Sequence, residues 1–178
     1  RTGRGNPDCG RRGGGRSDHP GAGRLRGGRR ERRLTGGDDP KFRALVRKLD
    51  REYVDRFGET ALQYQPYNTL EKIEAACLLL VDGTPAACGA IQPLDGDAAE
   101  LKRVYVLPEF RRRGLARQVI EQLELQALFH GYRFLALETG RAMPEAAALY
   151  TKLGYQETEP WGPFAGDKLC LCMKKELT

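Results

Sequence analysis

A junction between an apolar run and a helical pattern combines residues that could bind phosphate. Residues 103–118 read RVYVLPEFRRRGLARQ, and the apolar run ends at Pro108. A helix that begins just after such a run presents unpaired backbone N–H groups and the positive end of its dipole. Phosphate oxygens bind there, and arginine side chains add charge-assisted hydrogen bonds. The junction residues expected to bind a pyrophosphate are Arg111, Arg112, Arg113, Gly114, Leu115, Ala116 and Arg117.

Small residues at this junction suit the close approach of a ligand. Gly114 lacks a Cβ that would otherwise stand between the backbone and the phosphate. Ala116 keeps the next helical turn small. The spacing differs from the GxxxxGK[ST] loop, and no GxGxxG motif follows a strand pattern. The junction therefore predicts a diphosphate site unlike the two common nucleotide-binding loops.

The elements that would position this junction follow from the apolar pattern. Apolar residues at helical spacing predict a helix that begins at Pro40, is capped by Asp38 or Asp39, and ends at Gly58. Apolar runs and turn residues predict strands at 75–81, 86–92, 100–107, 134–139, 155–158 and 169–173, and helices at 114–130 and 144–153. The first three strands are joined by short turns, so we expect them to pair antiparallel.

The first 37 residues differ in composition from the rest. They hold eleven arginines, three acidic residues and twelve glycines, so their net charge is +8 while the whole chain carries +6. Residues 38–178 therefore carry −2, which argues against a fold that itself binds nucleic acid. The segment has almost no apolar side chains to offset its ordering entropy. We expect a disordered Arg/Gly-rich tail over 1–37, dispensable for catalysis, and one domain over 38–178.

Cysteine usage and hydropathy narrow the class of protein. Five cysteines without a regular framework favour reduced thiols and a cytoplasmic protein. No apolar stretch approaches the roughly 20 residues of a membrane span. Cys170 and Cys172 share a strand face, but no histidine or second paired motif accompanies them. We therefore expect no membrane association and no metal.

Three linked segments resemble the Gcn5-related N-acetyltransferase (GNAT) superfamily. Arg111-x-x-Gly114-x-Ala116 resembles its pyrophosphate-binding arm, and the segments ELKRVYVLPEFRRRGLAR, GYRFLALETG and PEAAALYTKLGY occur in the family's order and spacing. The resemblance covers residues 75–173. It implies an α/β (α+β) fold with a mixed, mostly antiparallel sheet of six to seven strands. Helices would flank the sheet, which would splay open between the fourth and fifth family strands.

The resemblance also implies where a co-substrate would bind. Acetyl-CoA would lie in the opening of the sheet, with its diphosphate on the arm. Its pantetheine would run along Val104, Tyr105 and Val106 like an added strand. In the family, a bulge in this strand frees a backbone N–H near Val104, which polarises the thioester carbonyl.

Candidates for proton transfer follow from the resemblance for Tyr150 and from strand position for two glutamates. Tyr150 holds the family's general-acid position, although it also fits the apolar stripe of its helix. Glu100 and Glu138 are candidate bases, of which we favour Glu100, whose alternative is a solvated strand end paired with Lys102 or Arg103. Strand alternation places Glu100, Lys102, Val104 and Val106 on one face.

The chain departs from the family at two places. Many relatives carry Asn or Gln where this chain has Met143, and that amide bonds the pantetheine. The family's first strand precedes its first helix, where this chain offers only RRLTGG, so we expect that strand to be missing or displaced. A loop with Trp161 and Phe164 either walls the acceptor site or packs on the surface.

The function implied by the resemblance is that of an N-acetyltransferase, an acyltransferase that uses acetyl-CoA. The acetyl group would pass directly to a primary amine of a small-molecule or peptide acceptor. Two alternatives stay open: a non-catalytic acyl-CoA-binding regulatory protein on the same fold, and an RNA-associated protein that works through its tail. Nucleic acid is otherwise not expected as a partner, and a homodimer is left open.

Overall fold

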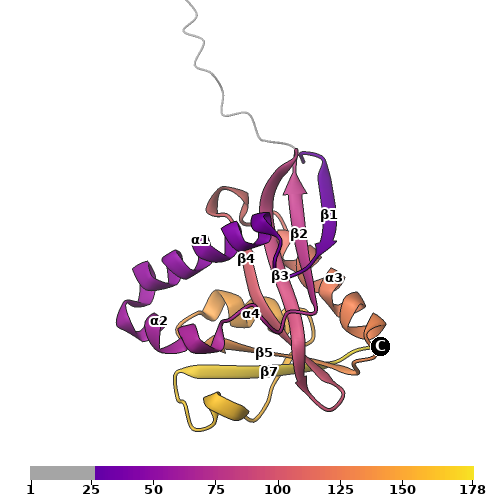
Figure 1. Cartoon of the computed structure of the whole chain (residues 1–178). Coiled ribbons are helices and arrows are strands. Elements are labelled where there is room, and N and C mark those ends of the chain that lie inside the picture. Colours follow the sequence, from indigo (N-terminus) through magenta and orange to yellow (C-terminus); the bar gives the residue numbers. More distant parts are fainter. Residues whose placement is uncertain (1–26) are drawn as a thin grey trace, which may run out of the picture.

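The computed structural model describes residues 27–178, which form a seven-stranded mixed sheet with helices on both faces (Figure 1). The strand order is β1-β2-β3-β4-β5-β7-β6. The strands are β1 (Arg30–Thr35), β2 (Ala75–Val81), β3 (Thr84–Asp95), β4 (Ala98–Val106), β5 (Phe134–Gly140), β6 (Gln156–Glu157) and β7 (Cys170–Glu176). The helices are α1 (Pro40–Phe57), α2 (Glu59–Tyr64), α3 (Leu115–Phe129) and α4 (Pro144–Lys152). This architecture confirms the expected α/β fold.

Two apolar layers hold the helices against the sheet. On one face, α1 packs its buried stripe against residues of β2, β3 and β4. On the other face, α3 buries Leu115, Val119 and Leu123 against the sheet, and α4 lies beside it. The helix α1 begins as the sequence predicts, since the Asp39 side chain accepts hydrogen bonds from the amides of Lys41 and Phe42. Within residues 27–178, the protein has no helix that is long and apolar enough to cross a membrane.

The first strand is present where the sequence suggested that it was missing. Arg30–Thr35 forms β1 and pairs antiparallel with β2 along its whole length. The sheet therefore includes residues that we had assigned to the tail, and the expected boundary at Asp38 falls too late. The side chains of β1 are mostly exposed and charged, so neither composition nor periodicity identifies this edge strand. The rest of the expected tail, residues 1–26, lies outside the described residues.

A short helix and a turn follow α1 where we expected a loop. They are α2 and a 3-10 turn at Gln65–Tyr67. Neither contains a buried residue, so the sequence carries no apolar periodicity that would reveal them.

Strands β4 and β5 run parallel but pair at one end only. The pairs join Ala98–Glu100 of β4 with Phe134–Ala136 of β5. Within the described residues, β4 has no hydrogen-bonded neighbour on this side beyond Glu100, while β5 continues along β7. The sheet therefore opens between its fourth and fifth strands, as the resemblance implies.

A bulge interrupts β4 beside this opening. Cys88 pairs with Tyr105, whereas Ala90 pairs with Lys102, so one residue of β3 faces two residues of β4. The extra residue, Arg103, has a φ of 57°. Such bulges leave a backbone N–H of the bulged strand outside the ladder.

The bulge reverses which side chains share a face. Alternation predicted that Glu100, Lys102, Val104 and Val106 would lie together. In the structure, Val104 and Val106 pack against the α3 side of the sheet, whereas Tyr105 belongs to the α1 side. That prediction was wrong because one extra residue shifts the alternation of everything that follows it.

A chain that begins at Asp38 should unfold at a lower temperature than one that begins at Gly27. Without β1, the edge of β2 loses its partner, although all seven residues of β2 are buried. A loss of about 2 kcal/mol would lower Tm by roughly 4–8 °C in a chain of this size. Thermal unfolding followed by circular dichroism measures the difference. Equal midpoints would show that β1 does not support the sheet.

Candidate active site

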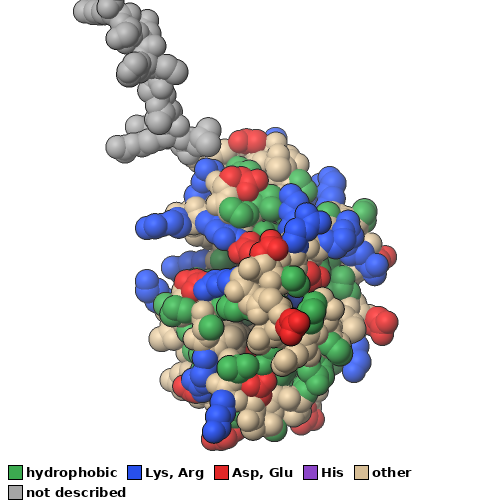
Figure 2. All heavy atoms as spheres, turned by 90° about the vertical axis from the view of Figure 1, so that its left-hand side faces the viewer, with side chains coloured by type: hydrophobic (Ala, Val, Ile, Leu, Met, Phe, Trp, Pro, Cys, Tyr) green, Lys and Arg blue, Asp and Glu red, His purple; other side chains and the backbone are tan. Residues whose placement is uncertain are grey.

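A cavity of about 640 Å³ occupies the opening between β4 and β5. Its walls come from α1 and α2, from β4, from the segment after β4, from the end of β5, and from α4. Figure 2 shows the side of the molecule on which α1 and α2 lie, where basic side chains gather across the upper half. The opening of the sheet is therefore a real hollow that side chains do not fill.

The cavity brings together almost every residue that the sequence predicted for the site. The candidate proton-transfer groups Glu100, Glu138 and Tyr150 all line it. The predicted co-substrate residues that line it are Val104, Tyr105, Val106, Arg111, Arg112, Gly114, Leu115, Ala116 and Arg117. Arg113 is the exception, because its guanidinium lies over the ring of Phe110, 5.4 Å from the centroid.

The start of α3 keeps free backbone donors beside the cavity. Gly114 is the N-cap, with φ 74° and ψ 17°, and Arg112 also has a positive φ of 61°. In residues 27–178, no side chain caps this end, and the three amides after Gly114 donate to no protein group. A Cβ on Gly114 would meet no protein atom within 4 Å, so the space before it is open. This arrangement suits an anion with several oxygens.

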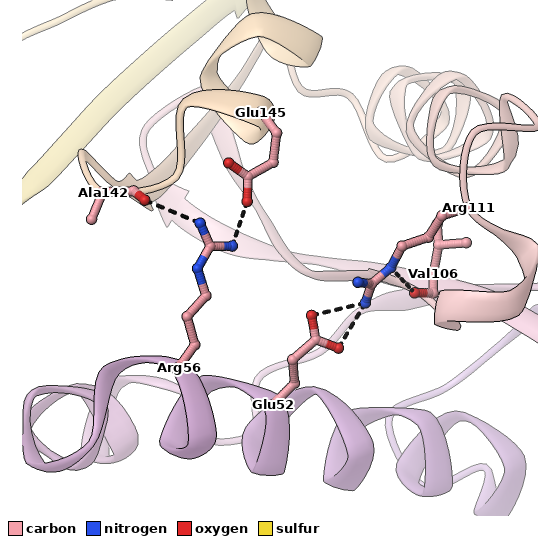
Figure 3. A network of polar contacts seen from close by, with 6 residues as sticks. All are labelled: Glu52, Arg56, Val106, Arg111, Ala142 and Glu145. Carbon is pink, nitrogen blue, oxygen red and sulfur yellow. Dashed lines mark hydrogen bonds and ion pairs between the residues drawn. The ribbon is translucent and has the colours of Figure 1, made fainter.

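Arg111 lines the cavity, but its guanidinium already binds other groups of the protein. Its Nε donates to the Val106 carbonyl at 3.0 Å, and its terminal nitrogen contacts both oxygens of Glu52 at 2.9 and 2.7 Å (Figure 3). The same guanidinium lies 5.6 Å from the ring centroid of Tyr105. Arg111 therefore fastens the arm to β4 and α1, which leaves Arg112 and the helix amides as the free donors.

A second contact in Figure 3 joins α1 to the far wall of the cavity. Arg56 forms an ion pair with Glu145 and donates to the Ala142 carbonyl at 3.2 Å. Glu145 lies in the first turn of α4, where a negative charge also complements the helix dipole. The pair is exposed, so it fixes the spacing between α1 and α4 more than it adds stability.

Glu100 is tied to neighbouring side chains. One carboxylate oxygen lies 3.6 Å from the Lys102 ammonium, and the other accepts a hydrogen bond from Gln92 at 2.9 Å. Both charged side chains are only 7% exposed. Lys102 also donates to the Tyr67 carbonyl at 2.6 Å, which anchors the segment after α2. The expected pairing with Lys102 is present, but the pair is buried rather than solvated.

Glu138 is the carboxylate of the cavity without a basic partner. In the described part of the chain, no lysine, arginine or histidine nitrogen lies within 4.0 Å of its oxygens. Burial raises its pKa above the usual range, while the neighbouring Cys170 and Lys102 oppose that rise. A half-buried carboxylate with a raised pKa is suited to accept a proton near neutral pH.

Tyr150 is buried in α4, and its ring packs edge-on against Tyr155 with centroids 5.7 Å apart. Its hydroxyl makes no hydrogen bond to another described residue and lies in the cavity lining. Burial raises the pKa of this phenol, so it stays protonated throughout the neutral range. It can donate a hydrogen bond to a ligand at no loss of an existing one.

The end of the cavity away from the arm is closed by aromatic residues. The hydroxyl of Tyr64 donates to Asp167 at 2.6 Å, which joins α2 to the loop before β7. Trp161 and Phe164 pack behind Tyr64 with Cys172 and do not line the cavity. Of the two alternatives for their loop, the structure supports packing.

Several lining residues carry no recognisable signal in the sequence. Tyr53 and Phe57 belong to the apolar pattern of α1 and were expected in the core. Glu52 stands on a charged helix face that sequence alone assigns to solvent. Only the packing of α1 against the arm and α4 shows that these residues border the cavity.

Replacement of Glu138 by Gln should stabilise the fold more at pH 7.5 than at pH 4. Because burial raises the pKa of this carboxyl in the folded state, folding loses stability as the pH rises through that pKa. Below the pKa of the unfolded chain, the Glu138 carboxyl is protonated in both the folded and the unfolded state, so burial of its charge no longer costs stability. The difference in Tm between Glu138→Gln and the parent should therefore grow with pH. An exposed control, Glu71→Gln, should show no such growth.

Comparisons with known proteins agree with this geometry. The family model "Acetyltransferase (GNAT) family" matches residues 42–155. The IAA acetyltransferase of Azospirillum brasilense is 34% identical over 135 residues, covering 75% of this chain and 88% of that protein. An uncharacterized N-acetyltransferase, YjgM of Escherichia coli, is 32% identical over 140 residues, covering 72% and 82%.

Solved structures share the fold. One from Klebsiella pneumoniae subsp. pneumoniae, assigned as an acyl-CoA N-acyltransferase, has a TM-score of 0.68 at 30% identity and covers 84% of this chain and 98% of its own. An acetyltransferase from Elizabethkingia anophelis, solved with acetyl-CoA bound, has a TM-score of 0.61 at 19% identity and covers 83% and 98%. The open sheet, the bulged strand and the arm agree with these matches. The chain belongs to the GNAT family of acetyltransferases.

Proposed function

We propose that this enzyme transfers the acetyl group of acetyl-CoA to a primary amine by direct attack. The observation that carries the proposal is the continuity of one cavity from the free amides of α3 to Glu138 and Tyr150. A diphosphate, a thioester and an amine would each meet suitable groups along it. A covalent acyl-enzyme intermediate is not needed, because both reactants reach the same cavity.

The arm and β4 supply the co-substrate contacts. The amides after Gly114 and the side chain of Arg112 would bind the diphosphate, since they lack protein partners in the described chain. The pantetheine would lie along Val104–Val106, where β4 has left β5. At the bulge between Lys102 and Tyr105, the Val104 N–H would donate to the thioester carbonyl.

The reaction needs two proton movements. An ammonium acceptor loses one proton to Glu138, which passes it to solvent, and the amine nitrogen attacks the thioester carbon. The C–N bond forms first, and the tetrahedral adduct then collapses with cleavage of the C–S bond and departure of the CoA thiolate. Tyr150 donates a hydrogen bond to the departing thiolate and gives up its proton only as the second nitrogen proton replaces it. The products are an amide and CoA with a free thiol.

Glu138 is the better placed of the two candidate bases. Both oxygens of Glu100 already contact protein groups, Lys102 and Gln92. Glu138 has no basic partner in the described residues, and burial raises its pKa towards the range in which a base works. The proposal therefore places the proton on Glu138, with Glu100 as the alternative that the kinetics below distinguish.

Replacement of Gly114 by Val should weaken acetyl-CoA binding by on the order of tenfold or more, since the side chain would fill the space before the free amides. Gly83→Val is the matched control. Gly83 lies in the β2–β3 turn with φ 79° and open space around it, so valine there costs similar backbone strain. Isothermal titration of both variants separates the effects. Equal affinities would refute the arm as the diphosphate site.

Tyr150→Phe should lower kcat on the order of 10²-fold while the affinity for acetyl-CoA stays near that of the parent. Glu138→Gln should remove the acidic limb of the pH profile of kcat/KM, whereas Glu100→Gln should keep it. The assay follows thiol release with a panel of amines. The reverse outcome for the two glutamates would assign the base to Glu100.

The same assay tests the proposal as a whole. A chain that binds acetyl-CoA but releases no thiol with any amine would be a binding protein on this fold, and the proposed activity would be wrong.

A further inference from the structure

The charged side chains that line the cavity are paired, with two exceptions. The pairs are Glu52 with Arg111, Glu100 with Lys102, Asp50 with Arg103, Glu121 with Arg117, Glu157 with Arg141 and Glu145 with Arg56. Within residues 27–178, Arg112 and Glu138 are the lining residues that have no opposite charge within 4.0 Å. These two are therefore the lining side chains whose charge is left for a ligand to pair, beside the free amides of α3.

The two exceptions belong to different parts of the site. Arg112 lies in the arm, where the proposed function places the diphosphate of acetyl-CoA. Glu138 lies near the end of β5, beside Cys170 at the start of β7. Once the co-substrate has neutralised Arg112, a single unpaired negative charge remains for the acceptor.

The wall around Glu138 offers apolar surface to the rest of the acceptor. The uncharged lining side chains that come from the end of α1, from α2 and the segment after it, and from the residue before β7 are Phe57, Thr60, Ala61, Tyr64, Asn68 and Leu169. Leu169 is 56% exposed and stands at the rim of this wall.

We propose that the acceptor is a small amine with one primary ammonium group and an uncharged, apolar body, aromatic or branched aliphatic. This inference rests on the proposed function and names its substrate class. The ammonium would pair with Glu138, and the body would pack on Phe57, Tyr64 and Leu169. The cavity of about 640 Å³ must also hold the thioester end of the co-substrate, which limits the acceptor's size.

The charge pattern also excludes other classes of acceptor. A diamine, a polyamine or an aminoglycoside brings further ammonium groups, and the remaining carboxylates of the cavity already have basic partners. An amino acid brings a carboxylate, and the basic side chains other than Arg112 are likewise paired. A buried charge without a partner is costly, so such acceptors should bind weakly.

A panel of amines tests the substrate class in the parent enzyme. With acetyl-CoA and thiol detection, 2-phenylethylamine and isoamylamine should exceed putrescine, spermidine, kanamycin and lysine in kcat/KM by at least about tenfold, the ratio that 1.4 kcal/mol of discrimination gives. A peptide with a free N-terminus is tested as a further acceptor. Preference for a polyamine, an aminoglycoside, an amino acid or the peptide would overturn the inference while leaving acetyl transfer intact.

A designed change in specificity tests the charge argument directly. Leu169→Glu places a second carboxylate on the apolar wall, and Leu169→Gln is the control of equal size without charge. The exposed position makes both variants compatible with the fold. The ratio of kcat/KM for putrescine to that for isoamylamine should rise roughly tenfold in Leu169→Glu only, the change that one 1.4 kcal/mol charge pair produces.

An unchanged ratio in Leu169→Glu would overturn the placement of the acceptor body on this wall. Failure of the proposed function looks different, because no amine would then release thiol from the parent enzyme even though acetyl-CoA binds.

Discussion

The site depends on β4, which separates from β5 after Glu100 and bulges against β3 opposite Gly89. Gly89 belongs to β3, and a Cβ there would lie 2.8 Å from a methyl of Val119 and 2.9 Å from one of Leu123. The helix α3 therefore packs directly on β3. Any larger residue would push the helix away. The same close contact fixes the start of α3 relative to the bulged part of β4. The free amides of the helix and the bulged part of β4 consequently border one cavity.

The helix α1 sets the other boundary of that cavity through three charged contacts. Asp50 pairs with Arg103 at the bulge, Glu52 with Arg111 of the arm, and Arg56 with Glu145 at α4. These contacts differ in how much they contribute to the stability of the fold. The Arg103 side chain is 2% exposed and its Nε has no hydrogen-bond partner among the described residues.

Loss of Asp50 would leave this buried charge uncompensated, which is costly, whereas the two exposed pairs contribute little to stability. We infer that the exposed pairs mainly position the arm and α4 relative to each other. A helix that the sequence identifies only as amphipathic therefore acts as the frame of the site.

Local patterns in the sequence were sufficient to predict most elements and the location of the arm. Apolar periodicity and turn residues identified α1, α3, the hairpin of β2 and β3, and the strand β4. They failed where the determining contact lies far away in the chain. The charged, exposed β1 is a strand because β2 offers it a partner, and the Arg111 guanidinium is paired within the protein because Glu52 reaches it. The bulge was expected from the resemblance, but the consequence for side-chain alternation required the register of β3 against β4.

Burial acts on the two proposed proton-transfer groups in opposite functional senses. It raises the pKa of Glu138, which makes this carboxylate a stronger base than an exposed one. It also raises the pKa of Tyr150, which makes the phenol a weaker acid. A free thiol has a pKa near 8.5, below that of the buried phenol, so complete proton transfer from Tyr150 to the thiolate is unfavourable by itself.

In the proposed reaction the hydroxyl would therefore serve mainly as a hydrogen-bond donor to the charge that develops on sulfur. The thiolate keeps the proton because the protonated nitrogen of the intermediate is a far stronger acid than either group. One apolar environment thus promotes both steps: it favours proton uptake at Glu138 and preserves a neutral donor at Tyr150.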